Sequence, residues 1–145
     1  METVEFFRKV DLFRFLSDGH LQRLAGQSRT VAFPEGNIIK DNDPIDGLYI
    51  IKSGMAKVTK SAKETAGVET VLAILRQGNS FGEISLIDGL PRSADVAAMG
   101  PIECYFLSRD AFLAALRESP EIALGMLPAL AAMVRSADQW VAQLI

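Results

Sequence analysis

The sequence predicts an α+β domain in which helices at both ends flank a central β-sandwich or β-barrel. Residues 1–28 and 108–145 carry apolar side chains at helical spacing. Residues 29–107 instead form short stretches rich in β-branched and aromatic residues, separated by turn-forming residues. The 145 residues are 49% hydrophobic and 23% charged, which suits one globular domain with a substantial core. We therefore expect residues 1–145 to be a single domain.

The N-terminal region contains clustered apolar residues that are typical of short amphipathic helices. Leu21 and Leu24 lie at helical spacing, and either Ser17 or Asp18 can serve as the N-cap of their helix. Several aromatic side chains precede this helix. We expect them to belong to the core or to an interface: Phe6, Phe7, Phe13 and Phe15.

The central region alternates between strands and turns. Strands are expected at residues 38–39, 48–51, 55–60, 68–75, 95–99 and 102–107. Turn-forming residues punctuate them at 34–37, 43–47, 52–54, 66–67 and 77–79. Short strands at this spacing predict a sandwich or a barrel.

The C-terminal region returns to helix. Ser108 is expected to cap a helix over 109–118, and residues 119–121 form a strong start signal for a second helix that runs to the C-terminus. Pro128 should bend this second helix, helped by Gly125. Its apolar face must cover the barrel mouth, meet a partner helix, or do both. That face consists of Met126, Leu130, Met133, Ala137, Trp140 and Leu144, widened by Leu127, Val134 and Val141.

Composition excludes several classes of protein. The net charge is −3 and the 15 basic residues are scattered, which argues against direct nucleic-acid binding by this chain. No apolar run is long enough to cross a bilayer and the N-terminus lacks the features of a signal peptide, so we expect a cytoplasmic protein without a membrane partner.

His20 and Cys104 are the only residues of their types in the chain. This excludes an intrachain disulfide and the multi-histidine metal site that a cupin-type enzyme would need. His20 is expected on a helix surface, and Cys104 is interpreted as a small buried hydrophobic residue in a strand. No nucleophile, base and orienting group come together, which argues against an enzyme.

Residues 81–94 place one acid and one base inside an otherwise apolar segment. Gly82 allows a sharp turn or a close approach of the backbone to a ligand. Glu83 then opens a short helical run that ends before Asp88. The start of such a run offers unpaired backbone N–H groups, here those of Ile84 and Ser85, to a phosphate.

Two charged side chains complete this segment. The guanidinium of Arg92 can hold two phosphate oxygens, and Ser93 can add its hydroxyl and its N–H as donors. Glu83, if ionised, only accepts hydrogen bonds, so its natural partner is a sugar hydroxyl. The segment therefore predicts a pocket for a sugar phosphate. The alternative is a structural ion pair between Glu83 and Arg92.

Residues 81–94 resemble the phosphate-binding cassette of cyclic nucleotide-binding domains, the family of the catabolite activator protein and of the regulatory subunits of cyclic AMP-dependent protein kinase. The resemblance extends through most of the chain. It implies that Glu83 binds the ribose 2′-hydroxyl and that Arg92 binds the cyclic phosphate. The complete set of ligand-binding residues expected from it is Phe81, Gly82, Glu83, Ile84, Ser85, Arg92, Ser93 and Ala94.

The resemblance also implies the architecture. Residues 29–107 would form a β-roll (jelly roll) similar to a double-stranded β-helix, and the N-terminal helices would move when ligand binds. The C-terminal helix would form a homodimer seam and close over the base as a lid. In the catabolite activator protein a threonine-serine pair on this helix contacts adenine, but the corresponding residues here are Ala137 and Asp138. Other candidates for the base contact are Arg135, Ser136 and Trp140.

The function expected from this resemblance is a non-enzymatic sensor whose ligand is a cyclic nucleotide, with cyclic AMP preferred and cyclic GMP as the alternative. No separate cofactor is implied. Ligand binding would shift the C-terminal helix between two arrangements. The alternative function is a dimerisation or interaction module of the same fold, with a vestigial pocket or a different small ligand.

Overall fold

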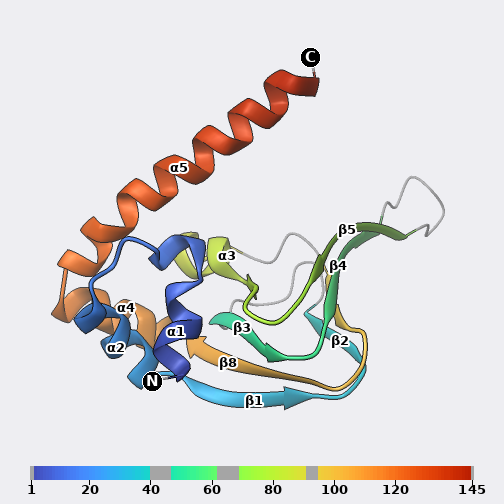
Figure 1. The fold of residues 1–145 in the computed structure, drawn as a ribbon, viewed down its shortest axis with the longest axis horizontal. Coiled ribbons are helices and arrows are strands. Elements are labelled where there is room, and N and C mark those ends of the chain that lie inside the picture. The colour runs from blue at the N-terminus through green and yellow to red at the C-terminus, as the bar shows by residue number, and fades with distance from the viewer. Residues whose placement is uncertain (1, 40–46, 62–68, 91–94, 145) are drawn as a thin grey trace.

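The computed structural model describes residues 2–39, 47–61, 69–90 and 95–144 (Figure 1). Three helical elements come first: α1 (Glu2–Arg8), the 3₁₀ turn η1 (Asp11–Phe13) and α2 (Asp18–Gly26). The strands and the cassette helix follow: β1 (Arg29–Phe33), β2 (Gly36–Ile39), β3 (Gly47–Ser53), β4 (Ala56–Ser61), β5 (Glu69–Leu75), β6 (Ser80–Phe81), α3 (Glu83–Asp88), β7 (Asp95–Ala98) and β8 (Ile102–Ser108). Two helices end the chain: α4 (Arg109–Glu118) and α5 (Glu121–Leu144).

The described strands form two four-stranded sheets with the orders β1-β8-β3-β6 and β2-β7-β4-β5. Neighbouring strands within each sheet pair in an antiparallel manner. The first strand, β1, pairs with the last strand, β8, and Val31 lies opposite Cys104. Strands distant in sequence thus lie side by side, as β1 and β8 do in Figure 1. The expected turns at 43–47 and 66–67 fall largely outside the described residues, and the turn expected at 34–37 is shorter because β2 already begins at Gly36.

Two hydrophobic clusters stabilise the domain. One lies between the sheets and includes Tyr49, Ile51 and Cys104. The other lies where the helices pack on the opposite faces of β3 and β8, and the largest fully buried side chains in it are Phe7, Phe13 and Phe112. The expected core positions of Phe6, Phe7 and Phe13 are therefore confirmed, whereas Phe15 is 54% exposed. Its ring instead contacts the guanidinium of Arg14, 4.9 Å from the ring centroid.

Local hydrogen bonds fix the helix starts. The hydroxyl of Ser17 accepts from the N–H of His20 at 3.2 Å, so Ser17 and not Asp18 is the cap of α2. The hydroxyl of Ser108 accepts from the N–H of Ala111 at 3.1 Å at the start of α4. Both caps satisfy donors that a helix start leaves unpaired. His20 is half-buried on α2.

The first turns of the terminal helix α5 are anchored in the domain. Ile122, Met126 and Ala129 are buried against the rest of the helical core, and an ideal Cβ at Gly125 would lie only 2.7 Å from the Cδ2 atom of Leu16. Gly125 therefore permits the close approach of α5 to the segment that precedes α2. Pro128 lies inside the continuous helix, as expected.

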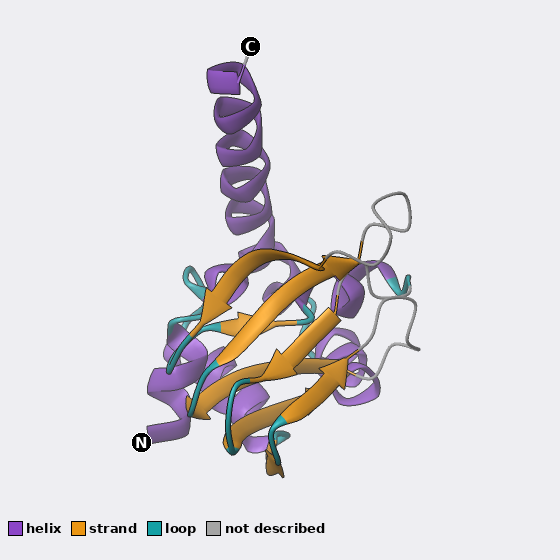
Figure 2. Ribbon diagram, turned by 90° about the vertical axis from the view of Figure 1, so that its right-hand side faces the viewer, coloured by secondary structure: helices purple, strands orange, loops and turns teal. Residues whose placement is uncertain are grey.

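Beyond these turns α5 leaves the domain and does not lie over either sheet (Figures 1 and 2). The expected lid position is therefore not the one that α5 takes here, because its anchored first turns direct it outwards. The apolar face expected on α5 is also divided between two environments. Met126 and Leu130 pack in the chain's own core, whereas Leu124, Leu127 and Val134 are the large apolar side chains left exposed among those that the structure describes on α5.

Within the described part of the chain, no helix combines the length and the apolarity that crossing a membrane requires.

Candidate functional site

The cassette helix α3 is a single short element between two glycines with positive φ. Gly82 precedes it with a φ of 95°, and Gly89 follows it with a φ of 71°. Both conformations are left-handed, which glycine adopts without steric cost. The N–H of Leu86 donates to the Gly82 carbonyl and the N–H of Gly89 donates to the Ser85 carbonyl, both at 3.0 Å. The expected helical run after Gly82 is present and extends to Asp88.

Phe81 and Leu86 hold this element in place. The ring of Phe81 stacks on Tyr49, with a centroid separation of 5.0 Å, in the cluster between the sheets. Leu86 is fully buried in the helical cluster. α3 is therefore attached to both cores, and its N-terminus lies at the boundary between them. The free N–H groups of that N-terminus are the donors expected to bind an anion.

The carboxyl of Glu83 is oriented by a neighbour. It accepts a hydrogen bond from the hydroxyl of Ser80, three residues earlier on β6. Burial raises the pKa of Glu83 because it disfavours the charged form; the Ser80 hydrogen bond lowers that pKa, and the negative charge of Asp11 raises it further. The carboxyl of Glu83 is thus held in one position, and its ionised form is unfavourable in the free protein.

Glu83 lines a hollow of about 300 Å³. A hollow of this size lies at the lower end of the range for small-molecule sites. Its lining comes from segments that are distant in the sequence: Lys9 follows α1 and Asp11 begins η1, whereas the other lining residues lie on β5, the turn after it, β6 and the start of α3. The described lining residues are Lys9, Asp11, Leu75, Gly78, Asn79, Ser80 and Glu83.

Lys9 has a defined place in this hollow. Its ammonium lies 5.3 Å from the ring centroid of Phe6, and an ideal Cβ at Gly78 would meet its Cδ atom at 3.3 Å. The amine of Lys9 and the carboxyls of Asp11 and Glu83 therefore border one space. Sequence reasoning missed Lys9, Asp11 and Ser80; only Ser80 had a local signal, because it precedes Glu83 by three residues.

Some of the expected site residues cannot be compared with this geometry. Arg92, Ser93 and Ala94 lie outside the described residues, as does the side chain of Ile84. The structure brings Gly82, Glu83 and Ser85 together at the start of α3, with Phe81 immediately before them. Their contacts with a ligand stay a prediction.

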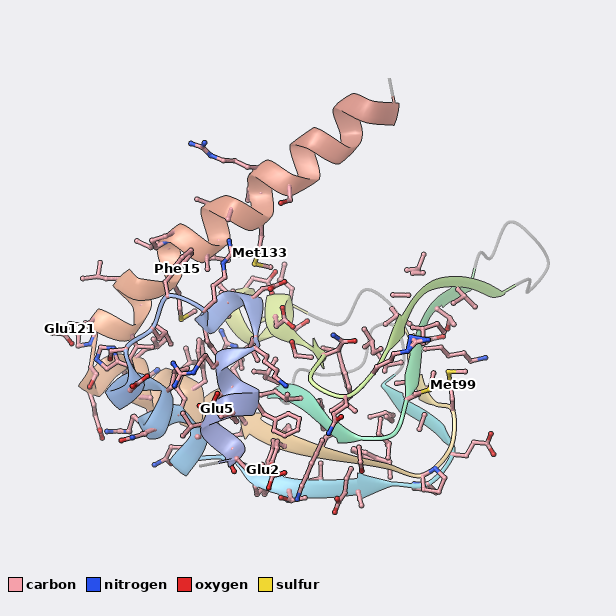
Figure 3. All side chains as sticks on the ribbon, in the orientation of Figure 1. Glu2, Glu5, Phe15, Met99, Glu121 and Met133 are labelled. Carbon is pink, nitrogen blue, oxygen red and sulfur yellow. The ribbon has the colours of Figure 1, made fainter. Side chains whose placement is uncertain are left out.

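The residues expected to contact a base lie on α5, away from the described lining of the Glu83 hollow. Arg135 and Ser136 are exposed, and the side chain of Trp140 lies outside the described part. Ser136 borders a second hollow, of about 230 Å³, between η1 and α5. Met133 lies on the same side of α5, which faces η1 (Figure 3). Asp11 lines both hollows, so η1 lies between the cassette and α5.

Among the described residues, no group of three or more His, Cys, Asp or Glu side chains could hold a metal ion. Cys104 is fully buried, and burial together with the charge of Glu103 raises the pKa of its thiol to about 12. Its interpretation as a buried hydrophobic residue is therefore confirmed.

Comparison with known proteins decides the family. Residues 30–119, more than half of the chain, match the family model of the cyclic nucleotide-binding domain. The chain belongs to this family. The resemblance carried by residues 81–94 is thereby confirmed, and so is the jelly-roll fold. Several proteins similar to this chain are named as transcriptional regulators or as regulatory subunits of protein kinases.

Three relatives illustrate the family. The chain is 30% identical over 142 residues to the "CRP-like cAMP-activated global transcriptional regulator" of Mycobacterium tuberculosis. The matched region covers 97% of this chain and 62% of that protein. The crystal structure of the N-terminal domain of a transcriptional regulator from Streptomyces coelicolor A3(2) matches with a TM-score of 0.82 and 27% identity over 94% of both chains. The regulatory domain of Toxoplasma gondii PKA, solved with cAMP, matches with a TM-score of 0.72 and 27% identity over 79% of this chain and 43% of that one. This cyclic nucleotide-binding domain thus spans 62% of its curated regulator relative.

Proposed function

We propose that this chain is a sensor that binds cyclic AMP at the start of α3, with cyclic GMP as the alternative ligand. Glu83 accepts a hydrogen bond from the ribose 2′-hydroxyl, and the free N–H groups at the start of α3 bind the cyclic phosphate. Arg92, four residues after the end of α3, supplies the charge that neutralises the phosphate.

The observation that carries this proposal is the position of Glu83. Its carboxyl is half-buried, is held by Ser80 and borders a hollow beside a helix N-terminus. The ionised form of such a carboxyl is unfavourable unless a ligand donates a hydrogen bond to it. A sugar hydroxyl is a suitable donor, because it satisfies the carboxylate without adding a charge. The names of two relatives support cyclic AMP as the nucleotide, since one is described as cAMP-activated and another was solved with cAMP.

The proposed output is a change in the arrangement of α5. Asp11 of η1 lines both the Glu83 hollow and the hollow beside α5, so a ligand that displaces η1 also alters the packing surface of α5. A ligand shifts such a balance only by binding one arrangement more tightly, and couplings of about 1–3 kcal/mol are typical. In this proposal the exposed residues Leu124, Leu127 and Val134 pack against the same helix of a second copy.

The exposed apolar face of α5 also supports a second candidate function. A domain of this fold with a vestigial pocket would use that face to dimerise or to bind a partner helix, without responding to a nucleotide. The two candidates differ in one property, which is the affinity for cyclic nucleotides.

Isothermal titration calorimetry with cyclic AMP and with cyclic GMP tests the proposal. The wild-type protein is expected to bind one nucleotide per chain, and Arg92→Ala is expected to lose about 2–5 kcal/mol of binding free energy because the phosphate loses its charged partner. Arg117→Ala, which removes an exposed arginine of α4, is the matched control. Absence of heat with both nucleotides, or equal affinities of wild type and Arg92→Ala, would favour the interaction module.

A further inference from the structure

Arg109 connects the cassette helix to the C-terminal helices. It is the first residue of α4, directly after the cap Ser108, and its side chain reaches back across the fold to α3. There its Nε–H donates to the carbonyl oxygen of Leu86 at 3.1 Å, in a partly buried position. The two residues are 23 positions apart, so this hydrogen bond is a tertiary link between elements.

α3 needs such a link at its C-terminal end. A helix of six residues is too short to be stable alone, and its last carbonyls have no partners within the helix. The guanidinium of Arg109 satisfies one of these carbonyls and places a positive charge at the negative end of the helix dipole.

The guanidinium also packs against the residue that ends α3. An ideal Cβ at Gly89 would lie 2.9 Å from the Nη2 atom of Arg109 and 3.2 Å from its Cζ atom. Gly89 also has a φ of 71°, which side-chain-bearing residues rarely adopt. The absence of a side chain at Gly89 therefore gives Arg109 both its space and its access to the Leu86 carbonyl.

Arg109 itself projects from a rigid helix. Phe112 and Ala115 of α4 are buried in the helical cluster, the Ser108 hydroxyl fixes the first turn, and Glu118 at the other end forms an ion pair with Arg23 of α2. A side chain that is anchored in this way can hold a less stable neighbour in one position.

We propose that Arg109 is the positioning residue of the cassette. By fixing the C-terminal end of α3 it holds the other end of the same helix, with Glu83 and the free N–H groups, in the geometry that a cyclic nucleotide requires. Because linkage is reciprocal, nucleotide binding at α3 then also favours the α4 arrangement in which Arg109 makes this contact. This inference rests on the proposed function for its ligand, but the contact itself needs no ligand.

The test compares Arg109→Ala and Arg109→Lys with Arg117→Ala, which removes an exposed arginine of the same helix. Calorimetry with cyclic AMP is expected to show roughly tenfold weaker binding for Arg109→Ala, the cost of a hydrogen bond to a charged group. Arg109→Lys keeps a cation and should restore part of that affinity, and Arg117→Ala should bind like the wild type. Wild-type affinity in Arg109→Ala, or an equal loss in Arg117→Ala, would overturn the inference.

Hydrogen exchange without nucleotide separates positioning from general stability. The amide of Leu86 bonds to Gly82 and the amide of Gly89 bonds to Ser85, so both report on α3. Arg109→Ala is expected to lower the protection of these two amides by about tenfold and to leave the amides of β3 unchanged. Unchanged protection in α3, or an equal loss in β3, would overturn the inference.

Failure of this inference and failure of the proposed function give different experimental results. If Arg109→Ala does not fold, Arg109→Lys decides the question by the same comparison: lower protection confined to α3 supports the inference, and unchanged or uniform protection overturns it. If the wild type binds neither cyclic AMP nor cyclic GMP, the proposed function fails. The exchange measurement still reports whether Arg109 holds α3.

Discussion

Replacement of Glu83 by glutamine is expected to weaken nucleotide binding and to stabilise the free protein. Glutamine keeps the length of the side chain and an oxygen that can accept from Ser80, so the geometry at β6 should persist. What disappears is the negative charge. In the free protein that charge is costly, because burial raises the pKa of Glu83 and Asp11 adds to the effect.

The two effects have different sizes and different pH dependences. The carboxylate bond to a ribose hydroxyl should contribute about 1.5–3 kcal/mol, so Glu83→Gln should bind cyclic AMP roughly 10- to 150-fold more weakly. For stability, the pKa of Glu83 in the folded state lies above its unfolded value. The wild type is therefore most stable below the unfolded pKa and loses stability as the pH rises through the folded pKa. The Glu83→Gln variant has no titrating group at this position, so it does not lose this stability as the pH rises.

Calorimetry at neutral pH and thermal melts across the acidic and neutral range measure both effects. Glu35→Gln, at an exposed site between β1 and β2, is the control for the removal of one negative charge. We expect the melting temperature of Glu83→Gln to exceed that of the wild type at neutral pH, and the difference to shrink on acidification. Equal nucleotide affinities, or a stability difference that is independent of pH, would refute the reasoning.

Three further predictions concern the rest of the chain. Val134→Glu should abolish dimers in sedimentation velocity while leaving the fold intact, because Val134 is 61% exposed and glutamate favours helix at least as well as valine; a wild type that stays monomeric at high concentration would contradict the proposed seam. Ser108→Ala should cost about 1 kcal/mol in urea denaturation through loss of the α4 cap, whereas Ser53→Ala on the exposed end of β3 should cost little. Cys104 should react with thiol reagents only after unfolding, because burial raises its pKa to about 12; labelling of the folded protein at a rate typical of free thiols would show otherwise.

Features that depend on neighbouring residues could be predicted from the sequence. The caps Ser17 and Ser108 each bond to an N–H three residues later, and the glycine at position 82 marks the turn that precedes α3. The boundaries of the three regions also follow from changes in apolar periodicity. In each case the interacting atoms are close in the chain, so their residue types carry the information.

Features that depend on distant residues could not be predicted in the same way. Nothing local to Glu83 indicates that Asp11 lies near it, and nothing in α4 indicates that Arg109 bonds to Leu86. The apolar periodicity of α5 predicted one broad face. It could not assign Met126 to the chain's own core and Val134 to the exposed side, because periodicity says which face is apolar and not what covers it.

A crystal structure of the protein with cyclic AMP tests the central claim most directly. It should place the cyclic phosphate against the first N–H groups of α3 and the guanidinium of Arg92, with the ribose 2′-hydroxyl on the carboxylate of Glu83. A nucleotide bound elsewhere, or a Glu83 hollow closed by the protein's own side chains at saturating nucleotide, would contradict the claim that this cassette is the sensor site.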